Sequence, residues 1–129
     1  MPSFGTLKAD TLTHSTAGSL ATNYVVEGSA KAWMNLDGES TAVLRSSFNL
    51  TSITDNGTGD YTATLTSSMS NSSYATPCSG GSDTSGRYNV IAEADGKTTG
   101  AADFFGFQTS AGSALDQAEV STCFLGDLA

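Results

Sequence analysis

The chain has 129 residues, a length typical of one domain, and its 5 basic and 13 acidic residues leave a net charge of −8. A surface of that sign repels phosphate backbones and anionic lipid headgroups, so neither nucleic acid nor a membrane is an expected partner. Ser and Thr account for 37 residues and Gly for 14, whereas charged residues make up only 14%. This composition favours strands and tight turns over helices or a disordered chain. We therefore expect an all-β protein.

Residues 1–23 carry little hydrophobic pattern. Their only large aliphatic residues are Leu7, Leu12 and Leu20. This spacing fits neither an amphipathic helix nor an alternating strand. We expect an extended N-terminal arm that becomes ordered only against another surface, and we assign it as the attachment element. The folded body is expected to span residues 24–129 and to begin with a short strand at Tyr24–Val26.

Alternation of apolar and polar residues predicts the strands of the body. They are expected at residues 30–36, 42–50, 61–66, 74–78, 87–94, 103–109 and 117–125. In the second of these, Phe48 shares its parity with Ala42 and Leu44, which places it on the buried side. Turn residues at 55–60 follow, so residues 42–66 are predicted to form a hairpin. Seven or eight short strands without a helical period predict an antiparallel β-sandwich or a small barrel.

The sequence offers little for catalysis. A serine-type triad needs a histidine as base, and the only histidine, His14, lies in the unpatterned arm. Most acidic residues lie in predicted turns, where their bonds to the backbone explain them without a catalytic pair. The turn at 55–60 is no calcium loop, because Gly57 and Gly59 stand where oxygen-bearing side chains are needed. We expect a non-enzymatic protein without a cofactor, a metal or catalytic residues.

Two cysteines, Cys78 and Cys123, lie 45 residues apart, in or beside predicted strands. A disulfide between them would stabilise a small domain, but assembly in a reducing cytoplasm favours free thiols. The sequence leaves both alternatives open. Zinc is not expected, since two cysteines and one distant histidine do not supply four ligands.

Two groups of aromatic residues are candidates for interaction surfaces. Trp33 lies on the polar side of its predicted strand, where it could stack on a sugar or pack against a neighbouring sheet or subunit. Phe104, Phe105 and Phe107 must point to both faces of one strand, since adjacent side chains alternate. A pair of sheets covers only one of those faces. The other face predicts an interface between subunits.

Four stretches of the sequence resemble one known family. The segments Gly28–Gly38 (GSAKAWMNLDG) and Leu44–Thr62 (LRSSFNLTSITDNGTGDYT) are similar to a strand and a hairpin of a β-domain of tailed-phage virion proteins, often labelled tail fibre. The opening Gly5–Leu12 (GTLKADTL) and the closing Val120–Gly126 (VSTCFLG) resemble the two ends of that domain. The resemblance therefore covers most of residues 5–126.

This resemblance implies a structural protein that forms a homotrimeric knob on the virion exterior, after assembly in the bacterial host cytoplasm. Such a knob would contact the major capsid protein and would decorate or stabilise the capsid. The alternative is a short tail-fibre or neck appendage that contacts tail or neck proteins and binds a receptor or glycan. The shortness of the chain favours the capsid.

Each role is expected of particular residues. The trimer interface is expected at Phe104, Phe105 and Phe107. Attachment to the particle is expected through Leu7, Lys8 and Leu12. Any ligand is expected to contact Trp33 or the Gly/Ser-rich residues 79–86.

Overall fold

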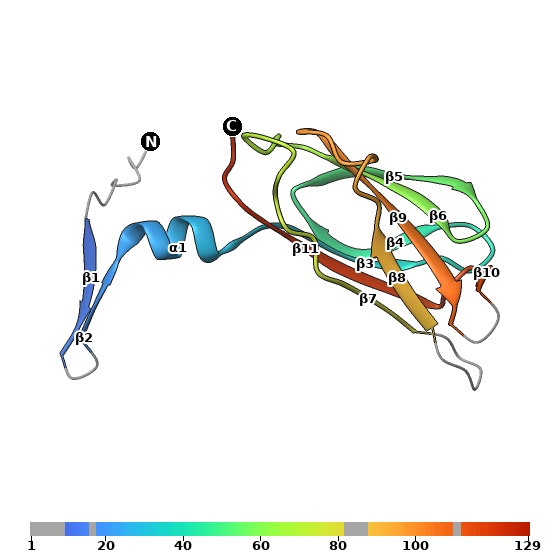
Figure 1. Ribbon diagram of the computed structural model, residues 1–129, viewed down its shortest axis with the longest axis horizontal. Coiled ribbons are helices and arrows are strands. Elements are labelled where there is room, and N and C mark those ends of the chain that lie inside the picture. The colour runs from blue at the N-terminus through green and yellow to red at the C-terminus, as the bar shows by residue number, and fades with distance from the viewer. Residues whose placement is uncertain (1–9, 16–17, 82–87, 110–111) are drawn as a thin grey trace, which may run out of the picture.

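The structure is a computed structural model that describes residues 10–15, 18–81, 88–109 and 112–129. The body is an all-β sandwich of two antiparallel sheets (Figure 1). This confirms the predicted fold class, and of its two forms the small barrel is wrong, because the sheets do not close into one. The arm projects from one end of the sandwich (Figure 1).

Each sheet contains strands from distant parts of the chain. Sheet I comprises β4 (Val43–Phe48), β3 (Ala30–Asp37), β11 (Glu119–Leu125) and β7 (Cys78–Gly81), in that order. Sheet II comprises β5 (Leu50–Gly57), β6 (Asp60–Leu65) and β9 (Ala101–Gln108), with β8 (Tyr88–Ala92) and β10 (Ser113–Ala114) also paired to β9. The chain therefore crosses repeatedly from one sheet to the other, which holds the two layers together.

The core lies between the sheets and is filled by one side of each strand. Fully buried members include Ala32, Leu36, Tyr61, Ala63, Phe104, Val120 and Phe124. Phe104 of sheet II meets Phe124 of sheet I edge to face, with ring centroids 6.0 Å apart, a favoured aromatic geometry. In β3, β6, β8 and β11 the apolar residues that alternate along the strand point into this core.

A buried polar cluster ties the two layers together near the β5–β6 turn. The Tyr61 hydroxyl lies 3.0 Å from the carbonyl oxygen of Gly38 and 3.1 Å from Asp116 Oδ1. The same carboxylate oxygen accepts the Gly59 N–H at 2.7 Å. Burial first, and then the hydrogen bond to Asp116, raise the pKa of Tyr61 well above its usual value. The hydroxyl is therefore held in its protonated, donating form.

Gln117 fills the space between the sheets beside this cluster. Its side chain is fully buried, and its amide nitrogen donates to the Asn89 carbonyl oxygen at 2.8 Å. Its amide oxygen has no hydrogen-bond partner among the described residues. Gly80 and Gly106 face the amide, and a side chain at Gly80 would overlap it. These glycines make room for the buried amide.

The hairpin predicted for residues 42–66 is wrong in its first strand. β6 pairs with β5, whereas β4 belongs to the other sheet. The chain crosses between the sheets at Asn49, whose φ of 58° lies in the left-handed region that asparagine tolerates. The Asn49 side chain stabilises the crossing, because it donates to Lys31 O at 3.0 Å and accepts from Ser67 N at 2.8 Å.

The strand predicted at 74–78 is also displaced, since β7 begins only at Cys78. Before it, Ala75 makes an isolated antiparallel bridge to Leu125. Pro77, which has no N–H to donate, marks the start of this edge strand, as expected for proline in a sheet.

The segment before the sandwich, which ends at Gly28 and is called the arm from here on, has more regular structure than predicted. β1 (Thr11–His14) and β2 (Gly18–Ala21) form an antiparallel hairpin, and α1 (Thr22–Gly28) follows. The strand predicted at Tyr24–Val26 is therefore wrong. A strand needs a neighbour for its backbone groups, whereas a helix satisfies them internally, and none of the described strands pairs with these residues. No helix in the described ranges has the length and apolar character needed to span a membrane.

Lys31 anchors α1 to the first strand of the body. Its ammonium group donates to the carbonyl oxygens of Val26 and, at 3.0 Å, Ser29. A cation at this end also favours the helix, because the C-terminal carbonyls carry partial negative charge. The direction in which the helix leaves the sandwich is therefore held by a side chain of β3.

Candidate functional site

The outer face of sheet I carries an aromatic patch, which we define as Trp33, Phe48 and Cys123. Trp33 on β3 lies directly opposite Phe48 on β4 and opposite Cys123 on β11. The Trp33 side chain is 40% exposed and Phe48 is 56% exposed. Three adjacent strands thus present a row of apolar side chains away from the core.

Phe48 reaches this face because of a β-bulge. The register between β3 and β4 shifts between Asn35 and Leu36, so that Arg45 is an extra residue without a direct partner. An extra residue reverses the parity of everything beyond it. Leu44 therefore points inward as predicted, but Phe48 points outward, and the prediction that Phe48 is buried is wrong. Arg45 pairs instead with Asp37, at 2.7 Å.

A polar cluster lies next to the aromatic patch on the same face of the sheet, two residues further along β3 and two residues earlier along β11. Asn35 Nδ2 donates to Ser121 Oγ at 2.9 Å and to Glu119 Oε1 at 3.1 Å. The Ser121 hydroxyl donates to the same Glu119 oxygen at 3.1 Å. An amide, a hydroxyl and a carboxylate beside an exposed indole are groups that can bind a sugar through its hydroxyls and its apolar face.

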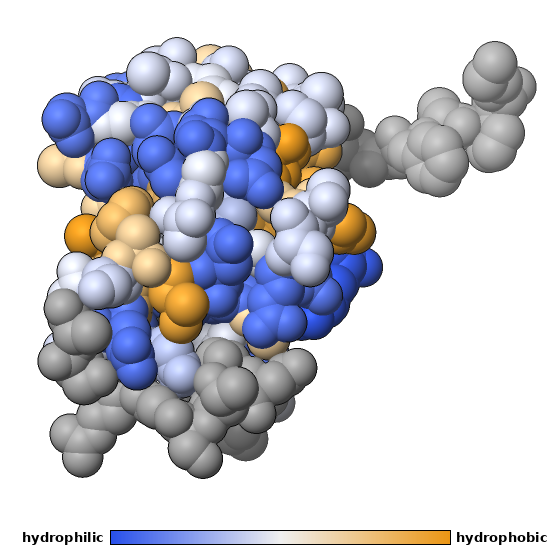
Figure 2. All heavy atoms as spheres, turned by 90° about the vertical axis from the view of Figure 1, so that its right-hand side faces the viewer, coloured by the Kyte–Doolittle hydropathy of each residue, from blue (hydrophilic) through white to orange (hydrophobic). Residues whose placement is uncertain are grey.

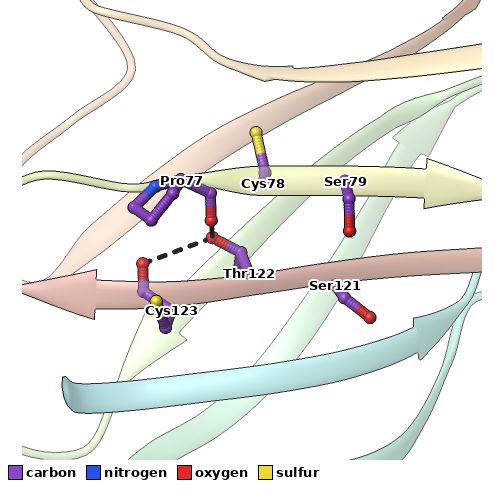
Figure 3. Close-up of a pocket in the computed structure, with 6 residues that line it drawn as sticks. All are labelled: Pro77, Cys78, Ser79, Ser121, Thr122 and Cys123. Carbon is purple, nitrogen blue, oxygen red and sulfur yellow. Dashed lines mark hydrogen bonds between the residues drawn. The ribbon is translucent and has the colours of Figure 1, made fainter.

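A shallow hollow of about 340 Å³ lies between β7 and β11 at the edge of the same sheet (Figure 3). It is lined by Pro77, Cys78, Ser79, Ser121, Thr122 and Cys123. Thr122 Oγ1 donates to the Pro77 carbonyl oxygen at 3.0 Å and thereby fixes the entry into β7. The floor of this hollow is formed by β7 and β11, which are hydrogen-bonded to each other. The hollow lies beside the polar cluster.

Cys78 and Cys123 are both free thiols, so the disulfide that the sequence left open is not formed. Cys78 pairs in register with Thr122, whose neighbour Cys123 points to the opposite face of the sheet. Figure 3 shows the Cys78 sulfur directed away from Cys123. It lies 3.1 Å from the Val90 carbonyl oxygen of sheet II, and burial raises the pKa of the Cys78 thiol.

The three phenylalanines of β9 divide between the two faces of their strand. Phe104 is fully buried in the core, so its prediction as a trimer-interface residue is wrong. Phe105 and Phe107 lie on the outer face of sheet II, half-buried and stacked with ring centroids 6.4 Å apart. Ile91 lies directly opposite Phe105 and is exposed. These three residues form a second, smaller apolar area.

The arm exposes its apolar side chains. Leu12 and Leu20 lie opposite each other in the hairpin and are 43% and 45% exposed. None of the α1 residues is buried, and Tyr24 is 66% exposed. Of the predicted attachment residues, Leu7 and Lys8 lie outside the described residues, as do residues 82–86 of the predicted ligand loop and the side chain of His14.

No group of three or more His, Cys, Asp or Glu side chains in the described ranges could hold a metal ion. The turn at 55–60 is instead held by its own hydrogen bonds. Asp55 Oδ1 accepts the Gly57 N–H at 3.1 Å, and Asn56 Nδ2 donates to Thr62 Oγ1 at 2.9 Å. These bonds give its polar side chains a structural role.

Comparison of the chain with protein-family models, with curated proteins and with solved structures finds no significant match. The site therefore rests on its own geometry. Trp33 was predicted from the sequence, whereas Phe48 was missed because nothing in the sequence marks the bulge. The Asn35, Ser121 and Glu119 cluster was missed because its members meet only through the register of β3 and β11.

Proposed function

We propose that this protein is a non-enzymatic structural protein of a tailed-phage virion. It forms a homotrimeric surface knob that decorates or stabilises the capsid. The observation that carries the proposal is the arm, a projecting hairpin and helix whose apolar side chains are left uncovered by the body. The similarity of residues 28–38 and 44–62 to a virion β-domain supports the same conclusion.

The energetics of the arm favour an assembled state. An isolated two-stranded hairpin is marginal in water, and a helix of seven residues is far below the length at which helices are stable alone. Leu12, Leu20 and Tyr24 would each gain roughly 1 kcal/mol or more if a partner removed them from water. A particle surface or a second copy provides such cover.

The opposite end of the molecule has a different character. Figure 2 looks onto the end of the sandwich away from the arm, where hydrophilic side chains predominate and apolar ones form small separate areas. An end of this composition suits a surface that stays in solvent. A knob attached through its arm and exposed at its far end fits this distribution.

The copy number per particle tests the proposal. Quantitative gel densitometry of purified virions should give copies in the hundreds if the protein decorates the capsid. A handful of copies would instead assign it to a tail-fibre or neck appendage. Light scattering of the purified protein tests the trimer, and a clean monomer at tens of micromolar would contradict it.

A receptor- or glycan-binding domain is the second candidate, and one observation favours it. Trp33 is exposed beside the hydrogen-bonded Asn35, Ser121 and Glu119 side chains. A glycan array should then give reproducible binding that is lost in Trp33→Ala. Ile91→Ala, on the outer face of sheet II and similarly exposed, is the matched control. Absence of binding to the array would leave the structural role alone.

A further inference from the structure

We propose that α1 of one copy packs on the aromatic patch of a second copy. The inference rests on the proposed homotrimer and identifies the two surfaces that join its subunits. Both surfaces are present in this chain, and neither is covered within it. α1 has no buried residue, and Trp33 and Phe48 are both exposed on the outer face of sheet I.

The helix cannot cover the patch of its own chain. Only Ser29 separates α1 from β3, and the Lys31 ammonium group holds the end of the helix through the Val26 and Ser29 carbonyl oxygens. Held in this way, α1 points away from the sandwich (Figure 1). Trp33 follows only two residues after Lys31, so a helix folded back onto it would have to break these bonds.

The dimensions of the two surfaces match. A helix of seven residues is about 10 Å long, at a rise of about 1.5 Å per residue. The patch spans three neighbouring strands, which places its outer members about 10 Å apart. The apolar side chains of α1, Tyr24, Val25 and Val26, are all exposed. Because an α-helix turns once every 3.6 residues, these consecutive side chains point to different sides, and one or two of them at a time meet the row.

Charge does not oppose this contact, although each copy carries a net charge of −8. The outer-face neighbours at Asn35, Ser46 and Ser121 are uncharged, and the nearby Glu119 carboxylate accepts hydrogen bonds from Asn35 and Ser121. The only ionisable carboxylate in α1 is Glu27.

The contact is heterologous, because a helix on one copy meets a sheet on the next. Such contacts form a ring when the rotation from one copy to the next closes on itself, and an open filament when it does not. In a ring of three copies, each α1 packs on the aromatic patch of the next copy, so that every patch is covered. In that arrangement Trp33 is covered, so the contact also competes with sugar binding at the same residue.

The native Cys123 allows a direct test in the full-length chain. Cysteine is introduced singly as Tyr24→Cys, Val25→Cys and Val26→Cys, which together cover the exposed side of α1. Under mild oxidation, at least one variant should form a disulfide to Cys123 of another copy, identified by mass spectrometry of the linked peptides. The link should disappear when Cys123→Ser is added. Thr54→Cys, on an exposed position of β5, is the control and should form no such link.

Sedimentation of the full-length chain gives the second measurement. Phe48→Ser should weaken self-association about ten-fold or more, whereas Ile91→Ser on the other sheet should leave it within about two-fold. An oligomer that forms no link from any of the three helix positions would overturn this inference and leave the homotrimer intact. A wild-type monomer at tens of micromolar would overturn both.

Discussion

The hydroxyl of Tyr61 lies 3.1 Å from Asp116 Oδ1, and this contact joins β6 in one sheet to the segment that leads into β11 in the other. We predict that Tyr61→Phe lowers the free energy of unfolding by about 1–2 kcal/mol, because it removes the hydroxyl beside the buried Gly38 carbonyl and leaves Asp116 Oδ1 with the Gly59 N–H as its donor. Urea unfolding measures the loss. Tyr24→Phe, on the exposed arm, should change the same quantity by less than about 0.5 kcal/mol.

Stability should fall at alkaline pH. Burial raises the pKa of Tyr61, of Tyr74 and of the Cys78 thiol, so the folded state holds these protons more tightly than the unfolded chain does. The contribution of these three groups to the free energy of unfolding is therefore constant below the unfolded pKa values, about 9 for cysteine and 10 for tyrosine, and declines as pH rises through them. A pH series of urea unfolding checks this. In Tyr61→Phe the decline above pH 10 should be shallower, and an unchanged slope would contradict the assignment.

Gly80 and Gly81 offer a matched pair in one strand. A Cβ at Gly80 would overlap the Gln117 amide and lie 2.6 Å from Val90 Cγ2, whereas one at Gly81 would meet only Glu119 Cβ at 3.9 Å. We expect Gly80→Ala to cost about 1–3 kcal/mol through overpacking, and Gly81→Ala to be nearly neutral. Thermal unfolding of the two variants distinguishes them. Equal stability would mean that Gln117 can move aside.

The two thiols should differ in reactivity. Cys123 lies on the outer face of sheet I, whereas Cys78 points inward to the Val90 carbonyl, and its raised pKa lowers the fraction of reactive thiolate. Alkylation of the native protein followed by mass spectrometry should modify Cys123 first. A reducing agent should leave the melting temperature unchanged, since there is no disulfide to break.

Removal of residues 1–28 should leave the sandwich folded. The first body strand begins at Ala30, and α1 contributes no buried residue to the core. The truncated chain should unfold with nearly the same free energy as the full-length chain. If its incorporation into particles is also lost or reduced, this would support the attachment role assigned to residues 1–23. If the truncated chain fails to fold, the arm belongs to the core.

Alternation predicted the strands whose two faces differ clearly. In β6 and β11, apolar and polar residues alternate without interruption, and the structure follows them. The bulge at Arg45 could not be predicted this way, because an extra residue leaves no mark in composition yet reverses the face of Phe48. The interface prediction for Phe104 failed for a different reason. Alternation shows that β9 is apolar on both faces but not which face meets the other sheet.

The arm was the least predictable segment. The local sequence of Tyr24–Val26 favours a strand, but these residues form a helix and belong to none of the sheets of the described residues. The polar cluster at Asn35 depends on the register between β3 and β11, which brings Asn35 to Glu119, 84 residues later in the chain. Local sequence patterns contain no information about such a register.

The long axis of the molecule has the arm at one end and the β5–β6 turn at the other (Figure 1). In any ring of identical copies, equivalent points lie at the same height along the symmetry axis. Three copies would therefore hold three identical Asp55–Asp60 turns in one plane. A receptor that bound a single turn weakly would find three identical turns side by side. Binding to several of them at once would raise its apparent affinity by orders of magnitude without any new kind of contact.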